Sequence, residues 1–66
     1  MNNAAISPEN DRVLRKREVL EIIGVSDTTL WRMQHQGEFP RPISISRNTK
    51  GWLLSTVYDW LYSRLQ

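Results

Sequence analysis

The sequence predicts a small α+β domain, mainly helical, with the order helix, turn, helix, β-hairpin and helix. An apolar helical pattern runs to Gly24, and Ser26 then stands at the position of a helix N-cap. Two short helices joined by a tight glycine turn are the outline of a helix-turn-helix. A strand pattern with a basic turn and a last amphipathic helix follow. They add the wing and the third helix of a winged helix-turn-helix.

Length and composition limit the classes of protein to which the chain can belong. A chain of 66 residues forms one domain, which buries only about 60% of its unfolded surface and has no room for an ordinary catalytic cleft. The chain has no cysteine, so disulfides and thiolate metal sites are excluded. It lacks a signal-peptide pattern and any apolar run near the roughly 18 residues that a membrane span needs. We therefore expect a cytoplasmic protein that is not an enzyme and has no cofactor, metal or membrane partner.

The first eleven residues differ in composition from the rest of the chain. Residues 1–11 contain Asn, Ser, Pro and acidic residues, with Ile6 as their one large apolar residue after Met1. Such a segment cannot bury enough surface to order itself. We expect a flexible N-terminal tail over residues 1–11 and a folded domain over residues 12–66.

The helix-turn-helix is expected over two short segments. The first helix spans Lys16–Ile23, with apolar residues on one side, and no Ser, Thr, Asp or Asn caps its start. The second spans Asp27–Gln36 and is closed by Gly37, which can take a left-handed conformation. The inward side of this second helix carries Thr29, Leu30 and Met33, and the outward side carries Asp27, Thr28, Trp31, Arg32 and His35.

The wing and the last helix complete the predicted fold. The prolines of residues 39–42 impose an extended connector. Residues 43–45 alternate between apolar and polar side chains, which predicts a half-buried strand. Residues 46–50 are expected to form a basic tip, and residues 51–53 the returning strand. The last helix starts at Ser55 as N-cap and runs to Leu65, with Val57, Trp60 and Leu61 facing the core and Trp52 beside them. Its apolar arc is broader than the roughly 100° stripe that one core face needs, so part of it is expected to meet a partner or cover the hairpin.

The net charge of +2 is modest, but the basic residues are clustered. The stretch between Thr28 and Trp52 contains four Arg or Lys residues and a single acidic residue, Glu38. Charge gathered on particular elements is expected of a polyanion binder, although a solvated basic surface is the plain alternative. The candidate DNA contacts are Arg15, Lys16, Thr28, Trp31, Arg32, His35, Arg41, Arg47, Asn48 and Lys50.

Trp31 is the sharpest of these candidates. Its position opposite Leu30 and Met33 favours packing on a DNA sugar or a thymine methyl group. The alternative is a hydrophobic contact with the hairpin, the tail or a second subunit, because tryptophan is usually largely buried.

Several segments carry a resemblance to a known family. They are residues 12–20, RVLRKREVL; 24–26, GVS; 28–33, TTLWRM; 37–43, GEFPRPI; 51–52, GW; and 55–61, STVYDWL. Together they resemble the AlpA family of prophage regulatory proteins over residues 12–65. The chain departs from the family pattern at two places. Leu53 and Leu54 stand at positions that are often charged in the family, and Ser44 and Ser46 stand where a basic residue and a glycine often occur. We expect a wing that packs differently and an apolar patch near Leu54 and Tyr58 that supports self-association.

The resemblance implies a MerR-like winged helix-turn-helix that binds double-stranded DNA and regulates genes of a mobile element. The second helix is then the recognition helix, and the protein is expected at the bacterial nucleoid. Possible further partners are a second copy on repeated sites and RNA polymerase or an integrase. An excisionase-like architectural factor that bends DNA for an integrase is a close alternative. A protein-interaction module that works through the last helix is the alternative of another class.

Overall fold

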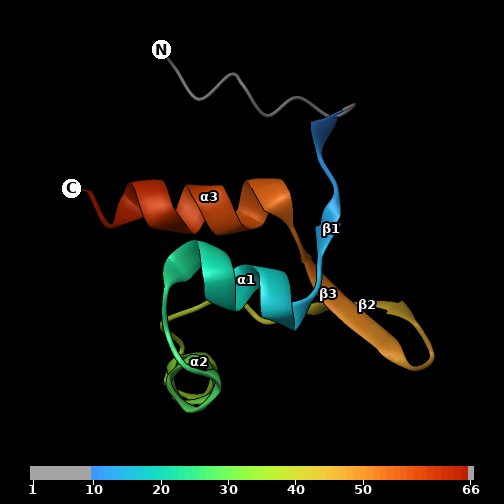
Figure 1. The fold of residues 1–66 in the computed structure, drawn as a ribbon, viewed down its shortest axis with the longest axis horizontal. Helices are drawn as coiled ribbons and strands as arrows, with labels where there is room; N and C mark the ends of the chain where they lie inside the picture. Colours follow the sequence, from blue (N-terminus) through green and yellow to red (C-terminus); the bar gives the residue numbers. More distant parts are fainter. Residues whose placement is uncertain (1–9, 66) are drawn as a thin grey trace.

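The structure, a computed structural model, describes residues 10–65. The elements follow one another as β1 (Val13–Leu14), α1 (Lys16–Ile23), α2 (Asp27–His35), β2 (Ile43–Ser46), β3 (Thr49–Leu53) and α3 (Leu54–Ser63). In Figure 1, α1 and α3 run across the view, α2 is seen end-on, and the β2–β3 hairpin extends away from the helices. The α+β fold predicted from the sequence is confirmed. The predicted tail lies largely in residues 1–9, outside the described residues, and its flexibility stays a prediction.

Helix α1 has the bounds that its apolar pattern predicts, and a residue of its own first turn caps its start. The Arg15 backbone N–H donates to Glu18 Oε1 at 2.9 Å, and Arg12 Nη1 donates to Glu18 Oε2 at 3.0 Å. Arg15 itself carries only side-chain donors, so it cannot accept a bond from the first-turn amides. The helix ends at Ile23 and is capped by Gly24, which has a φ of 73° and donates its N–H to the Leu20 carbonyl.

Helix α2 is capped at both ends by the residues that the sequence indicates. The Ser26 hydroxyl accepts a hydrogen bond from the Thr29 N–H at 3.1 Å. Gly37 has a φ of 75°, and the Glu38 N–H reaches back to the Met33 carbonyl at 2.8 Å. That bond, together with the one from the Gly37 N–H to the Gln34 carbonyl, is a Schellman motif. The helix ends at His35, one residue before the predicted end.

The hairpin belongs to a three-stranded antiparallel sheet in the order β1-β3-β2. Strand β1 was not predicted, since two residues carry no periodic signal; it pairs Val13 with Leu53 and Leu14 with Trp52. Gly51 makes this pairing possible, because a Cβ at that position would lie 2.6 Å from the Leu14 carbonyl oxygen and 2.6 Å from Val13 Cγ1. The sheet thus depends on a glycine for the close approach of β1 to β3.

Two expectations about the wing are wrong. Only Arg47 and Asn48 form the turn, while Lys50 lies within β3 opposite Ser44, so it is not at the hairpin tip. Strand β2 is not half-buried, since Ile43 is 46% and Ile45 is 44% exposed. Ile43 lies opposite Gly51, and therefore on the face of the sheet that points away from the buried Trp52.

The core includes a residue that the sequence analysis placed in a connector. The buried side chains are Leu14, Val19, Leu30, Phe39, Trp52 and Val57. Phe39 presents its ring edge-on to two indoles, with centroid distances of 6.0 Å to Trp52 and 4.9 Å to Trp60. The predicted core positions of Leu30, Trp52 and Val57 are confirmed, while Trp60 is partly buried and packs against the cluster.

The same two indoles hold the connector between α2 and β2 through hydrogen bonds. Trp52 Nε1 donates to the Pro40 carbonyl at 2.8 Å, and Trp60 Nε1 donates to the Glu38 carbonyl at 2.7 Å. Arg64 adds a second bond to the Glu38 carbonyl at 3.2 Å and lies 4.6 Å from the centroid of the Trp60 ring. The connector is thereby tied to both the sheet and α3.

Helix α3 starts earlier than predicted, and its cap comes from a distant part of the sequence. Its N-cap residue is Leu53, and Ser55 lies inside the first turn. Asp11 supplies the missing acceptors: its Oδ1 accepts from the Ser55 N–H at 3.0 Å, and its Oδ2 accepts from the Ser55 hydroxyl at 2.7 Å. Asp11, which composition placed in the tail, is therefore bonded to the domain.

The broad apolar arc of α3 divides into an inner and an outer part. Leu54, Trp60 and Leu61 pack against the core. Tyr62 is 50% exposed, and Leu65 is 79% exposed and lies beyond the helix, which ends at Ser63. The predicted apolar patch is thus not centred on Leu54, because that side chain is turned to the core.

Replacing Trp52 by Phe tests the tie between sheet and connector. The variant keeps an aromatic ring but leaves the Pro40 carbonyl without its donor, which costs about 1 kcal/mol of unfolding free energy. For a domain of this size we expect thermal melting to shift down by roughly 4–8 °C. Trp31→Phe is the matched control, since Trp31 is exposed and its indole N–H bonds nothing in residues 10–65. Equal melting of both variants would contradict the role given to the indole N–H.

The Asp11 cap predicts a loss of stability in acid. Hydrogen bonds from Ser55 are the largest cause that lowers the pKa of Asp11 from its ordinary value of 3.8. Because the folded pKa lies below the unfolded one, the stabilisation is complete above pH 3.8 and is lost as the pH falls through the folded pKa. Asp11→Asn should lower the melting temperature at neutral pH. The difference in melting temperature between the variant and the parent protein should shrink as the pH falls below 3.8.

The comparison of Asp11→Asn with the parent protein isolates the Asp11 cap from the other carboxylates. Bonds from the Arg15 N–H and from Arg12 lower the pKa of Glu18 in the same way, but Glu18 titrates in both proteins and cancels in the difference. Asp59→Asn removes an exposed carboxylate from the same helix as Ser55. If Asp59→Asn and Asp11→Asn behaved alike, the stabilisation would be a general charge effect rather than a cap.

Candidate nucleic-acid interface

The outward face of α2 carries the exposed residues that the helical pattern predicts. Thr28, Trp31, Arg32 and His35 are all exposed. Leu30, by contrast, is fully buried, and Met33 packs against the core. Trp31 is 59% exposed, so it is not a core residue.

Trp31 and His35 form one unit on this face. Their rings stack with centroids 3.9 Å apart and planes inclined by 28°. His35 Nδ1 lies 2.9 Å from the Trp31 carbonyl oxygen, and since a carbonyl only accepts, Nδ1 carries the hydrogen. The stack and this bond hold both rings in place on the exposed side of the helix.

The first-helix candidates lie at the N-terminus of α1. Arg15 is the exposed N-cap residue, and Lys16 begins the helix. Lys16 Nζ lies 2.9 Å from Asp27 Oδ2, and the pair joins the starts of α1 and α2. Both side chains are more than half exposed, so this ion pair is weak and can exchange for another anion.

The cations around α2 and the wing have no carboxylate partner among residues 10–65. The ion pairs in residues 10–65 join Arg12 to Glu18 and Lys16 to Asp27. The side chains without a carboxylate partner in that part of the chain include Arg32, Arg41, Arg47 and Lys50. Arg47 and Asn48 occupy the exposed turn of the wing. Positive charge is therefore available along α2, the connector and the hairpin.

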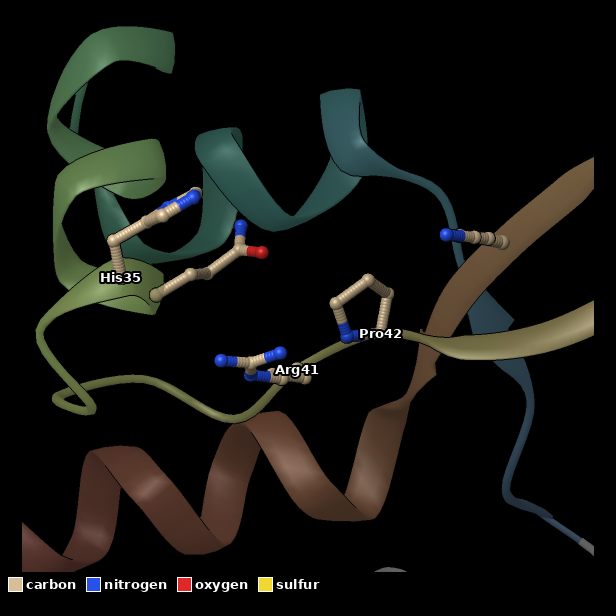
Figure 2. Close-up of a pocket in the computed structure, with 5 residues that line it drawn as sticks. His35, Arg41 and Pro42 are labelled. Carbon is tan, nitrogen blue, oxygen red and sulfur yellow. The ribbon is translucent and has the colours of Figure 1, made fainter.

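A pocket of about 340 Å³ lies where these three elements meet. Gln34, His35, Arg41, Pro42 and Lys50 line it. Figure 2 shows His35 reaching in from α2, while Arg41 and Pro42 come from the connector. Lys50 also lines the pocket. Its side chain lies on the same face of β3 as that of Trp52, because the two residues are two positions apart in the strand.

The structure thus brings three of the sequence candidates, His35, Arg41 and Lys50, to one place. Gln34 and Pro42 also line the pocket, and neither was predicted as a site residue. Gln34 carries no signal, since a polar residue between two faces of a short helix is ordinary. Pro42 was seen only as an element of the extended connector.

Among residues 10–65, no group of at least three His, Asp or Glu side chains is placed to hold a metal ion. No helix in that range is long and apolar enough to cross a membrane.

Helix-turn-helix, β-hairpin and third helix define a winged helix-turn-helix. The profile of the family described as prophage CP4-57 regulatory protein (AlpA) matches residues 12–65. The chain belongs to this family of prophage regulatory proteins.

A relative from a phage agrees with this assignment. The uncharacterized protein ORF88 of Enterobacteria phage P4 is 34% identical over 55 residues, which is 83% of this chain. The match covers 62% of the length of ORF88, so the relative has additional sequence that this chain does not match.

Proposed function

We propose that this protein is a sequence-specific, double-stranded DNA-binding regulator of transcription in a prophage or similar mobile element. One observation carries the proposal: α2 is held in the core by Leu30, while its other side exposes Trp31, Arg32 and His35. A helix exposed in this way beside a basic wing has the form of a reader of the DNA major groove.

In this proposal three exposed residues of α2 contact the groove. Arg32 donates to a guanine edge or to a phosphate, and Thr28 at the start of the helix reaches a base edge or a phosphate. Trp31, fixed by its stack on His35, packs against a sugar or a thymine methyl group.

The surrounding basic residues hold the backbone of the DNA. Arg47 and Asn48 at the wing tip contact phosphates on one side of α2, and Arg15 contacts them at the start of α1. Lys16 joins them by exchanging its bond with Asp27 for one with a phosphate. Bound protein then blocks a promoter or recruits RNA polymerase, and DNA binding keeps it at the nucleoid.

Selection of bound sequences from a random duplex pool tests this function. A regulator enriches one sequence, and its affinity for that sequence falls as the salt concentration rises. An enriched sequence that the protein strongly bends would instead identify an architectural factor acting with an integrase. Absence of any salt-dependent affinity would reject DNA binding and leave the interaction module.

Arg32→Ala tests the reading role of α2. Since Arg32 is exposed and has no ion pair within residues 10–65, its removal should change the free energy of unfolding by less than about 0.5 kcal/mol. Its affinity for the enriched duplex should fall clearly. Glu21→Ala, an exposed change on α1, serves as the control that keeps affinity. A variant that melts several degrees lower and binds normally would make Arg32 structural.

A prediction about assembly follows from the size of the domain. Single modules bury only about 600–1,000 Å² of protein surface on DNA, so specificity in a genome needs two or more copies on repeated sites. We expect a monomer or weak dimer in solution and cooperative loading on DNA with repeated half-sites. Sedimentation of the free protein and of the complex measures both. A tight dimer without DNA, or strictly one-to-one binding to the natural site, would contradict this prediction.

A further inference from the structure

We infer that the pocket between α2, the connector and β3 holds a single phosphate of the DNA backbone, shared by Arg41 and Lys50. The inference rests on the proposed function and specifies one contact within it. The pocket brings two cations from separate segments together with Gln34 and His35, and no carboxylate lines it.

The chemistry of the lining matches a phosphodiester. Arg41 offers a planar fork of N–H donors, which fits two oxygens of one phosphate, and Lys50 offers a compact point charge. Gln34 adds amide donors, and His35 Nε2 has no bonding partner in residues 10–65. Two like charges in one hollow repel each other, and a bound anion relieves that repulsion.

Each wall of the pocket is fixed by a contact outside it. The His35 ring is held by the Trp31 carbonyl and by the stack with Trp31. Arg41 follows Pro40, whose carbonyl is bonded by the buried Trp52. Lys50 is held in register opposite Ser44 in the sheet. The pocket is therefore formed before DNA arrives, which lowers the entropic cost of binding.

The position of the pocket defines which phosphate it takes. The hollow lies between the recognition helix and the wing, so a strand passing from one to the other crosses it. A phosphate seated there fixes the register of both elements on the duplex. Arg47, at the tip of the hairpin, contacts a different phosphate.

Salt dependence of binding to a short duplex of random sequence tests the sharing. Each phosphate contact contributes about 0.9 to the slope of log K against log salt. If Arg41 and Lys50 share one phosphate, the double variant Arg41→Gln/Lys50→Gln should lose about 0.9 in slope. Arg47→Gln/Lys50→Gln should also lose only about 0.9, because Arg41 still holds the shared phosphate, whereas the triple variant Arg41→Gln/Arg47→Gln/Lys50→Gln should lose about 1.8. Lys50→Arg keeps the charge and should retain the parent slope.

Controls separate the possible failures. Arg17→Gln removes an exposed cation outside the pocket and should leave the slope unchanged, and thermal melting of every variant confirms folding. A loss of about 1.8 for Arg41→Gln/Lys50→Gln, or no loss, would overturn the shared phosphate while the proposed function stands. No salt-dependent binding by the parent protein would overturn the proposed function itself.

A second measurement distinguishes the DNA backbone from free phosphate as the ligand. Amide resonances of Gln34, His35 and Lys50 are followed by NMR during titration with the duplex and, separately, with inorganic phosphate at constant ionic strength. We expect large shifts with the duplex only. If inorganic phosphate caused shifts as large as those caused by the duplex, the pocket would be a free-anion site, and the assignment to the DNA backbone would be overturned.

Discussion

The arrangement of this small domain depends on two indole N–H groups that bind one short connector. Trp52 and Trp60 donate to the Pro40 and Glu38 carbonyls, and Phe39 between them fills the space against both rings. The prolines leave the connector no regular secondary structure of its own, so its carbonyls are free to accept these bonds. Because the connector joins α2 to β2, the same bonds set α2 against the wing.

Three acidic residues of the domain serve the starts of helices, while the basic residues of α2, the connector and the wing stay exposed. Asp11 and Glu18 accept backbone N–H groups at the starts of α3 and α1, and Asp27 pairs with Lys16 at the start of α2. These carboxylates are therefore engaged at helix starts, where the helix dipole favours negative charge. The cations on the second half of α2, the connector and the wing have no acidic partner in residues 10–65. The positive potential of the domain is therefore concentrated on these elements, although its net charge is modest.

How far the sequence could predict this structure depended on whether each signal was local. Ser26, Gly24 and Gly37 act within one or two turns, and they indicated the end of α1, the start of α2 and, to within one residue, the end of α2. The cap of α3 could not be predicted, because Asp11 and Ser55 are 44 residues apart. The burial of Phe39 depends on two rings that only the fold brings near. The outward face of α2 was predictable from helical period, whereas the pocket required the register of β3 to place Lys50.

The bond between Asp11 and Ser55 also bears on where the folding unit begins. The family profile starts at residue 12, one position after the side chain that completes the first turn of α3. A domain excised at that boundary, for fusion to another protein or for grafting onto a new scaffold, would contain all its helices and strands and yet lack one of their caps. The transferable module therefore begins no later than Asp11.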